Sequence, residues 1–242
     1  MAKRGSADVA FLLIDGWDVL GQQTQLEDTR SAVLERSDAL GDLYEEHTFT
    51  GVRRAELTQQ GFLDDGANSA HEALSTGPGV ARVLVYGMEG TVTGAGFEGW
   101  ASAVQVNYEQ LMARESLHKA NARYLTAGPV EHGRIVRTLK PAVATGVTSA
   151  NALDNGASST GGAGYFAYTS GGEANVRMRH SSDGVTWATL FTFARANASR
   201  GAERLMTTGT IERYVDMDYT TATATGTASF NFFGGLVRGL TT

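Results

Sequence analysis

The sequence predicts a mainly β protein, a sandwich or barrel with one short flanking helix. Glycine is abundant (30 residues) and proline scarce (3) among the 242 residues, as in chains of short strands joined by tight turns. Glycine-rich stretches such as GTVTGAGFEG and NGASSTGGAGY lie between the apolar runs. The second half has five strand-like runs at the regular spacing of an antiparallel sandwich: YFAYTS, ANVRMRHS, VTWATLFTF, TIERYVDMDY and ASFNFFGGLVRG.

Composition excludes several classes of protein. The chain has no cysteine, which excludes a disulfide framework and a thiolate metal site and fits synthesis in a reducing cytoplasm. A net charge of −6 argues against the basic patch of a conventional nucleic-acid binder. No apolar run is long enough to span a membrane. The apolar stretch near the start, residues 9–14, is too short for a signal-peptide core and predicts a strand.

The first half contains three segments that bear on function. Residues 21–46 are highly charged, with Leu26, Val33 and Leu40 at seven-residue spacing. This spacing is typical of either a short amphipathic helix or an extended loop that docks on another surface. NSAHEAL predicts a helix of about two turns with Asn68 as its N-cap. QLMARESLHKANARYL contains good helix formers, so its state, helix or strand, stays open.

Alternation assigns side chains to faces in two strand-like segments. ASAVQVNYEQL has one face with Val104, Val106 and Tyr108 and another with Gln105, Asn107 and Glu109. TIERYVDMDY has an apolar face with Ile211, Val215, Met217 and Tyr219; Glu212, Asp216 and Asp218 share the other face with Tyr214. Carboxylates on one strand face repel one another, so we expect these three to point into water or a water-filled space.

Asp183-Gly184 is a strong hairpin signal, because it separates two alternating apolar runs. We expect it to be a bend rather than a ligand site. Trp187 is in phase with Val185 and Phe191, which predicts a core residue rather than a platform for a sugar ring.

No set of residues indicates catalysis. GAGFEG matches the dinucleotide-binding pattern, but a strand-like run follows it where that site requires a helix. The five histidines are scattered, no nucleophile motif is present, and neighbouring Glu and His residues are typical of surface ion pairs. We therefore expect no enzyme activity, no cofactor and no metal site.

A weak internal repeat predicts two copies of one fold. An ungapped offset of 131 residues places Phe62 on Phe193 and aligns a helix-like segment, a turn and a strand. The predicted domains are residues 1–140, which include the charged segment 21–46, and residues 141–242.

Several stretches together resemble the tail tube (major tail) proteins of long-tailed bacteriophages. In the first half they are DVAFLLIDGWDVLG, DALGDLYEEHTFTGVRRAELTQQGFLDDG, AHEALSTGPGVARVLVYG and SAVQVNYEQL. In the second half they are VRMRHSSDGVTWATLFTFA, GAERLMTTGTIERYVDMDYT and ASFNFFGGLVRG. The chain departs from this pattern at residues 110–132, which are more charged and more helix-like.

The resemblance implies a structural virion protein of the tail, made and assembled in the host bacterial cytoplasm. Its subunits would form stacked rings around a channel through which double-stranded DNA passes at ejection. With a duplicated domain the ring would be a trimer of pseudo-sixfold symmetry; the alternative is a hexamer. The implied partners are further copies of the chain, a tape-measure protein, and the tail terminator and distal tail proteins.

Candidate functional residues follow from this resemblance. A channel of carboxylates would repel phosphates and let DNA slide, which makes Glu56, Glu212, Asp216 and Asp218 candidate channel-lining acids; an outer, solvated face is the alternative for them. The charged segment would dock on the next ring through Leu26, Glu27, Asp28, Arg30, Glu35, Arg36 and Asp38. The alternative function is a carbohydrate-binding β-sandwich of a tail fibre or secreted enzyme, which would expose Trp17, Trp100 or Trp187.

Overall fold

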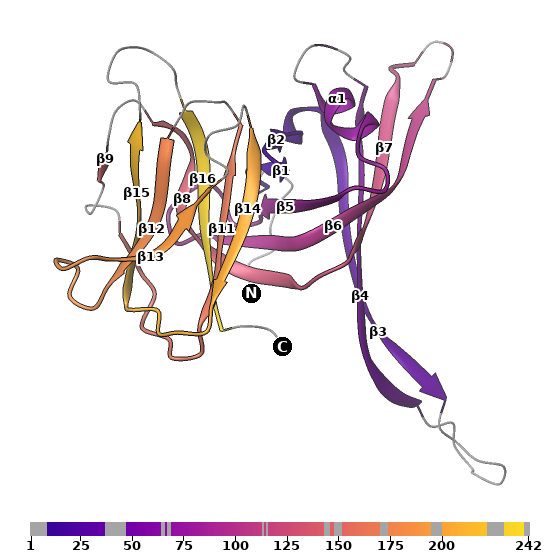
Figure 1. The fold of residues 1–242 in the computed structure, drawn as a ribbon. Coiled ribbons are helices and arrows are strands. Elements are labelled where there is room, and N and C mark those ends of the chain that lie inside the picture. Colours follow the sequence, from indigo (N-terminus) through magenta and orange to yellow (C-terminus); the bar gives the residue numbers. More distant parts are fainter. Residues whose placement is uncertain are drawn as a thin grey trace, which may run out of the picture.

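The computed structural model describes most of the chain. The described residues are 9–36, 47–63, 66, 69–112, 114, 116–142, 146–147, 152–169, 174–194, 200–221 and 230–239. Within them the fold is mainly β, as predicted, with a single short α-helix (Figure 1).

Along the chain, strands follow one another and are joined by turns and, in the described part, by two short helices. The first half holds β1 (Leu12–Ile14), β2 (Trp17–Asp18), the 3-10 helix η2 (Leu20–Gln22), β3 (Gln23–Arg36), β4 (His47–Phe62), α1 (Ala70–Ser75), β5 (Ala81–Gly87), β6 (Gly96–Leu111) and β7 (Lys119–Thr126). They are followed by β8 (Val130–Ala142), β9 (Gly146–Val147), β10 (Leu153–Asp154), β11 (Gly162–Tyr168), β12 (Ala174–Ser181), β13 (Ala188–Phe193), β14 (Gly201–Thr207), β15 (Tyr214–Thr221) and β16 (Phe230–Arg238).

The strands form two antiparallel sheets (Figure 1). The larger has 11 strands in the order β14-β11-β16-β8-β6-β5-β1-β2, and β7, β4 and β3 branch from β6. The smaller has five strands, β10-β15-β12-β13 with β9 on β15. Strand β8 pairs with both β6 and β16, so the large sheet runs through the predicted domain boundary at residue 140.

Three apolar clusters hold these layers together. One lies between the small sheet and β8, β11 and β16 and draws its residues from positions 136–236. A second fills the space enclosed by β1, β4, β5, β6, β7 and α1, between positions 12 and 124. The third combines both halves, with Phe11 and Phe97 packed on Phe233. Strand β11 contributes to the first and third clusters from opposite faces, which explains why all its residues are buried.

The charged segment forms a strand where the sequence left a helix or a loop open. Residues 23–36 are β3, which pairs along its length with β4. Residues 37–46 lie outside the described part. The helix-like stretch at 110–132 also contains mostly strand, since β6 ends at Leu111 and β7 begins at Lys119.

Three local predictions are confirmed. Helix α1 forms within NSAHEAL, although its N-cap is Ser69; the predicted cap, Asn68, lies outside the described residues. The residues that follow GAGFEG form a strand as predicted, since β6 begins within this motif at Gly96 and continues to Leu111. Asp183 and Gly184 form the bend between β12 and β13, and Gly184 has a φ of 76°.

Two predictions are wrong in detail. The offset of 131 residues places α1 on β14, a strand, so the shared order of helix, turn and strand is not found at that offset. Trp187 and Val185 do not join the core with Phe191: Val185 is 80% exposed and Trp187 is half-buried. Val185 lies in the turn that precedes β13, and a register shift after Met178 leaves Leu190 as an extra residue in β13, so Trp187 is out of phase with Phe191.

Candidate assembly surfaces

Four neighbouring strands present a polar surface directed away from the core. In the order β3–β4–β7–β6 they pair antiparallel, and residues opposite each other point to the same side. The alternate residues, including Leu57 and Tyr124, are buried in the enclosed cluster. We call the outward set the polar face: Gln25, Glu27, Thr29, Glu56, Thr58, Gln60, Val104, Asn107, Glu109, Asn121, Arg123 and Leu125.

Neutral amides and hydroxyls dominate the polar face. Gln25, Gln60 and Asn121 lie opposite one another in register and form a row of amides, which Glu109 of β6 completes with a carboxylate. Such groups bind water without concentrating charge, so the surface suits a hydrated contact rather than a dry interface.

Glu56, a predicted channel-lining acid, lies on the polar face and is paired. Its carboxylate accepts two hydrogen bonds from Arg123, at 2.5 Å from Nε and 2.7 Å from Nη2. The hydrogen bonds from Arg123 lower the pKa of Glu56, which keeps the carboxylate ionised. This two-point contact also holds the guanidinium in place, so its charge is offset where it faces solvent.

A two-stranded hairpin projects from the body of the molecule (Figure 1). Strand β7 pairs with β4 only from Glu56 onward, and the rest of β4 pairs with β3 alone among the described strands. Residues 30–36 of β3, which pair with residues 47–55 of β4 across a bulge, span about 20 Å at about 3.3 Å per residue. We call residues 31–36 and 47–54 the projecting hairpin; its Leu34 is 55% exposed.

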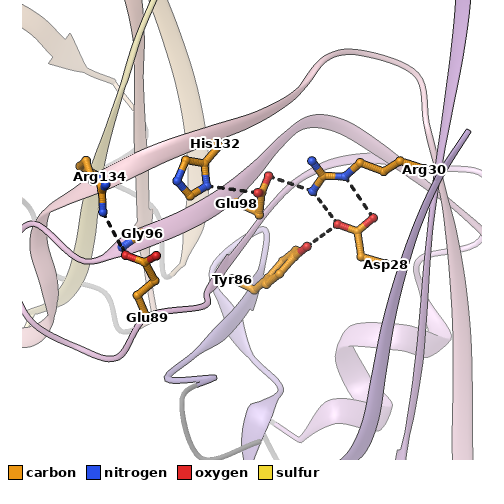
Figure 2. Close-up of polar contacts among 8 residues, drawn as sticks. All are labelled: Asp28, Arg30, Tyr86, Glu89, Gly96, Glu98, His132 and Arg134. Carbon is orange, nitrogen blue, oxygen red and sulfur yellow. Dashed lines mark hydrogen bonds and ion pairs between the residues drawn. The ribbon is translucent and has the colours of Figure 1, made fainter. Parts of the chain in front are cut away.

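A polar network ties the base of this hairpin to the body (Figure 2). Arg30 of β3 contacts Asp28 at 2.7 Å and the buried carboxylate of Glu98 on β6 at 2.9 Å. Tyr86 of β5 donates its hydroxyl hydrogen to Asp28, and His132 of β8 lies 3.2 Å from the other oxygen of Glu98.

The network joins four strands that are far apart in sequence. Burial and the hydrogen bond to Asp28 raise the pKa of Tyr86, so its hydroxyl stays protonated and remains a donor at neutral pH. The direction in which the hairpin leaves the body is therefore set by charge-assisted contacts as well as by backbone pairing.

Of the other predicted channel-lining acids, Asp216 and Asp218 lie on β15 of the small sheet and are not solvated, and Glu212 lies just before that strand. Asp216 and Asp218 are buried, and each is paired with an arginine of neighbouring β12. Arg179 contacts Asp216 at 2.9 Å, and Arg177 contacts Asp218. The expectation that these acids point into water is wrong, because cross-strand pairing with arginine satisfies them within the sheet. Glu212 is half-exposed, and its backbone N–H donates to His180.

The predicted inter-ring residues divide between the two sides of the paired strands β3 and β4. Leu26 packs on the enclosed cluster, whereas Glu27 lies on the polar face. Asp28 and Arg30 belong to the network at the base. Of the rest, Glu35 and Arg36 end β3 in the projecting hairpin, and Asp38 lies outside the described residues.

The tryptophans offer little to a sugar. Trp100 is fully buried. Trp17 and Trp187 are half-buried, and an arginine covers one face of each ring: Arg200 at 3.6 Å and Arg179 at 4.5 Å from the ring centres. A carbohydrate platform needs an open aromatic face, so the structure disfavours the carbohydrate-binding alternative.

No group of three or more His, Asp or Glu residues in the described part of the chain is arranged to hold a metal ion. None of the helices found in that part of the chain is long and apolar enough to cross a membrane.

Sequence comparisons give no assignment, since no family model and no curated protein matches the chain. Structural comparison finds chains of low identity. One, from "Virion of native gene transfer agent (GTA) particle", has 11% identity and a TM-score of 0.42, and the match covers 53% of this chain and 97% of that one. Another, from "Tail of empty GTA particle", has 11% identity, a TM-score of 0.41 and the same coverage. The Dit protein of SPP1, described as a hub adsorption apparatus of phages infecting Gram-positive hosts, has 8% identity and a TM-score of 0.37 over 95% of this chain and 99% of that one.

Sequence reasoning missed the residues that organise these surfaces. Arg123 stood in a segment whose state was left open, and Tyr86 and Glu98 lay in separate strands with no pattern linking them. The alternation of Gln25, Glu27 and Thr29 was a usable signal for an outward strand face.

Proposed function

We propose that this chain is a structural subunit of a phage tail tube, with no catalytic activity. The observation that carries the proposal is the projecting hairpin. A two-stranded hairpin is marginally stable in water by itself, so a ribbon about 20 Å long needs a partner surface. Together with the resemblance found in the sequence, this favours a subunit whose structure is completed by assembly.

The edges of the four-stranded sheet support assembly into a ring. Strand β3 pairs with β4 only, and residues 106–111 of β6 pair with β7 only, among the described strands. Both outer edges of β3–β4–β7–β6 are thus available for strand addition. Because β6 runs opposite to β3, the β3 of a second copy beside β6 continues the antiparallel order. This contact is head-to-tail, and repeating it closes a ring when the rotation between neighbouring copies divides a full turn evenly.

Strand geometry favours six copies in the ring over three. Strands lie about 4.8 Å apart, and a tilt of about 40° spreads them to about 6.3 Å around a barrel. One four-stranded sheet per chain gives a 12-stranded barrel about 24 Å across for three copies, or about 48 Å for six. Side chains inside the wall remove about 10 Å, so only the larger ring admits duplex DNA.

The polar face then lines the channel. Its acids are Glu27, Glu56 and Glu109, and its base, Arg123, is held by Glu56; Arg54 and Lys119 lie on the same side just beyond its two ends. A hydrated wall of nearly balanced charge does not grip phosphates strongly, which suits passage of DNA during ejection. The tape-measure, terminator and distal tail proteins are the further partners that this role implies, and the protein would reside in the virion tail.

Sedimentation velocity over a concentration series, with negative-stain microscopy of the fast-sedimenting fraction, tests the proposal. We expect rings or hollow tubes with a channel wide enough for duplex DNA, and six repeats per ring. Monomers at every concentration would overturn the proposal and reopen the carbohydrate-binding alternative, to be tested by tryptophan quenching with oligosaccharides.

A further inference from the structure

The connection between β10 and β11 contains Asn155-Gly156, the only Asn-Gly pair in the sequence. Gly156 is exposed with a φ of 67°, and a Cβ placed on it would meet no atom within 4 Å. The side-chain amide of Asn155 makes no hydrogen bond with any residue that the structure describes. Because glycine has no Cβ and the space around it is open, the backbone nitrogen of Gly156 is sterically accessible to this amide.

A carboxylate lies beside the same backbone nitrogen. Asp154 accepts hydrogen bonds from Arg213 at 2.9 Å (Nε) and 2.7 Å (Nη2). These contacts, together with the backbone N–H of Gly156, lower the pKa of Asp154, so the carboxylate is ionised at neutral pH. An ionised carboxylate next to an N–H group is placed to accept its proton, and loss of that proton makes the backbone nitrogen nucleophilic.

A comparable bend, Asp183-Gly184, is held in the opposite way. Its carboxylate accepts the N–H groups of residues 185 and 186, each at 2.8 Å, and the N–H of Gly184 donates to Oγ of Ser181 at 2.9 Å. The N–H groups of residues 186 and 185 hold the pKa of Asp183 far below its usual range. An ionised carboxylate is a poor target for a nucleophile, and the nitrogen of Gly184 is already engaged. This bend is therefore protected, whereas the pair between β10 and β11 is not.

We propose that Asn155 is a modification site, at which the folded chain deamidates without an enzyme. The backbone nitrogen of Gly156 gives up its proton and forms a bond to Cγ of Asn155. The bond from Cγ to the side-chain nitrogen breaks, and this nitrogen leaves with the proton as ammonia. Water then opens the resulting succinimide ring at either carbonyl, which gives aspartate or isoaspartate at position 155. Water is the only co-reactant, and the inference does not depend on the proposed function.

The products would alter the edge of the small sheet. The N–H of Asn155 donates to the carbonyl of Arg213 at 3.2 Å, and the N–H of Ser158 donates to the carbonyl of Ile211 at 2.8 Å. Isoaspartate lengthens the main chain between these two bonds by one carbon, so we expect one of them to be lost, with faster hydrogen exchange there. Aspartate keeps the main chain but adds a negative charge beside Asp154, which then shares Arg213 with it.

Incubation of the purified chain in water enriched in heavy oxygen, followed by peptide mapping by mass spectrometry, tests the inference. Ring opening places a heavy oxygen on the residue, so each event is recorded at its own position. We expect label at residue 155 that accumulates faster at mildly alkaline pH. We expect none at Asp183, and none at Asn175, which is exposed in β12 but is followed by Val176. No label at residue 155, or equal label at residues 155 and 175, would overturn the inference.

Two variants separate the reaction from the fold. Asn155→Gln keeps an amide but requires a larger ring, so label at this position should be lost while the urea midpoint of unfolding stays that of the parent chain. Asp154→Ser removes the carboxylate beside Gly156, so label should accumulate several-fold more slowly. Labelling of Asn155→Gln at the parent rate would overturn the site, and labelling of Asp154→Ser at the parent rate would overturn the part assigned to Asp154.

Discussion

Replacing Glu131 by glutamine is expected to destabilise the folded chain strongly, because this carboxylate is fully buried in the middle of the large sheet. It accepts hydrogen bonds from the hydroxyl of Tyr165 at 2.6 Å and from Arg204 at 2.7 Å (Nε) and 2.6 Å (Nη2). The three residues connect β8, β11 and β14. Burial and the hydrogen bond to Glu131 also raise the pKa of Tyr165, so its hydroxyl remains a donor.

The size of the destabilisation follows from the buried charge of Arg204, which Glu131→Gln leaves unpaired. The Glu131→Gln side chain keeps one acceptor oxygen, but its amide N–H₂ cannot accept a hydrogen bond from Arg204. The guanidinium of Arg204 also loses its counter-charge. Removing one partner of a buried ion pair costs about 3–5 kcal/mol. This is about a 100- to 5,000-fold change in the folding equilibrium. For a chain of this size, about 6–20 °C is lost from the Tm.

Chemical denaturation at low protein concentration, followed by tryptophan fluorescence, measures the effect. Adding Arg204→Met to Glu131→Gln is expected to restore part of the stability, because no unpaired buried charge remains. Asp154→Asn is the control: it removes an ion pair with Arg213 in which both side chains are about half exposed. If Glu131→Gln shifts the unfolding midpoint no more than Asp154→Asn, the energetic reasoning is refuted.

Three further predictions concern the pairing of Glu56 with Arg123, the pH dependence of stability, and the turn at Gly16. Glu56→Gln frees Arg123, so this variant is expected to bind duplex DNA at low salt, as measured by fluorescence anisotropy. The double variant Glu56→Gln with Arg123→Gln is expected not to bind. Equal binding by both variants would mean that Glu56 does not mask the charge of Arg123. Burial lowers the pKa of His180, whose Nδ1 accepts a backbone N–H, so the unfolded chain takes up the proton first. Stability should therefore fall as the pH drops below about 6.5. The urea midpoint of unfolding, measured from pH 8 to 5, should lose this pH dependence in His180→Asn and keep it in His118→Asn. Gly16→Ala should cost about 2 kcal/mol or more in the same urea assay, because φ is 84° and a Cβ would lie 2.4 Å from backbone atoms of β11 and β14; an unchanged midpoint would contradict the close approach of backbone at this turn.

Regular alternation was enough to predict part of the fold. Ile211, Val215, Met217 and Tyr219 are all buried in one cluster, as their spacing in TIERYVDMDY predicted. The bend at Asp183-Gly184 follows from turn chemistry: the side chain of Asp183 accepts the N–H groups of residues 185 and 186, each at 2.8 Å. These features depend on neighbours in sequence, which is why the sequence reveals them.

Features that depend on bulges and distant partners were not predictable in this way. A bulge at Val106 leaves that side chain exposed and buries Gln105, the reverse of the faces expected for ASAVQVNYEQL. Asp216 and Asp218 share a face, as alternation predicted, but only the pairing of β12 with β15 places an arginine opposite each. The length of the projecting hairpin was hidden for a related reason, since the pairing of β3 with β4 has no local signature in either strand.

A cryo-electron microscopy reconstruction of the assembled protein would show which face of the four-stranded sheet lines the channel. We expect a hollow tube whose wall is a continuous antiparallel barrel. The polar face of β3–β4–β7–β6 should line the channel, and each projecting hairpin should lie against the next ring. A tube with this face on the outside, or a protein that stays monomeric at high concentration, would contradict this expectation.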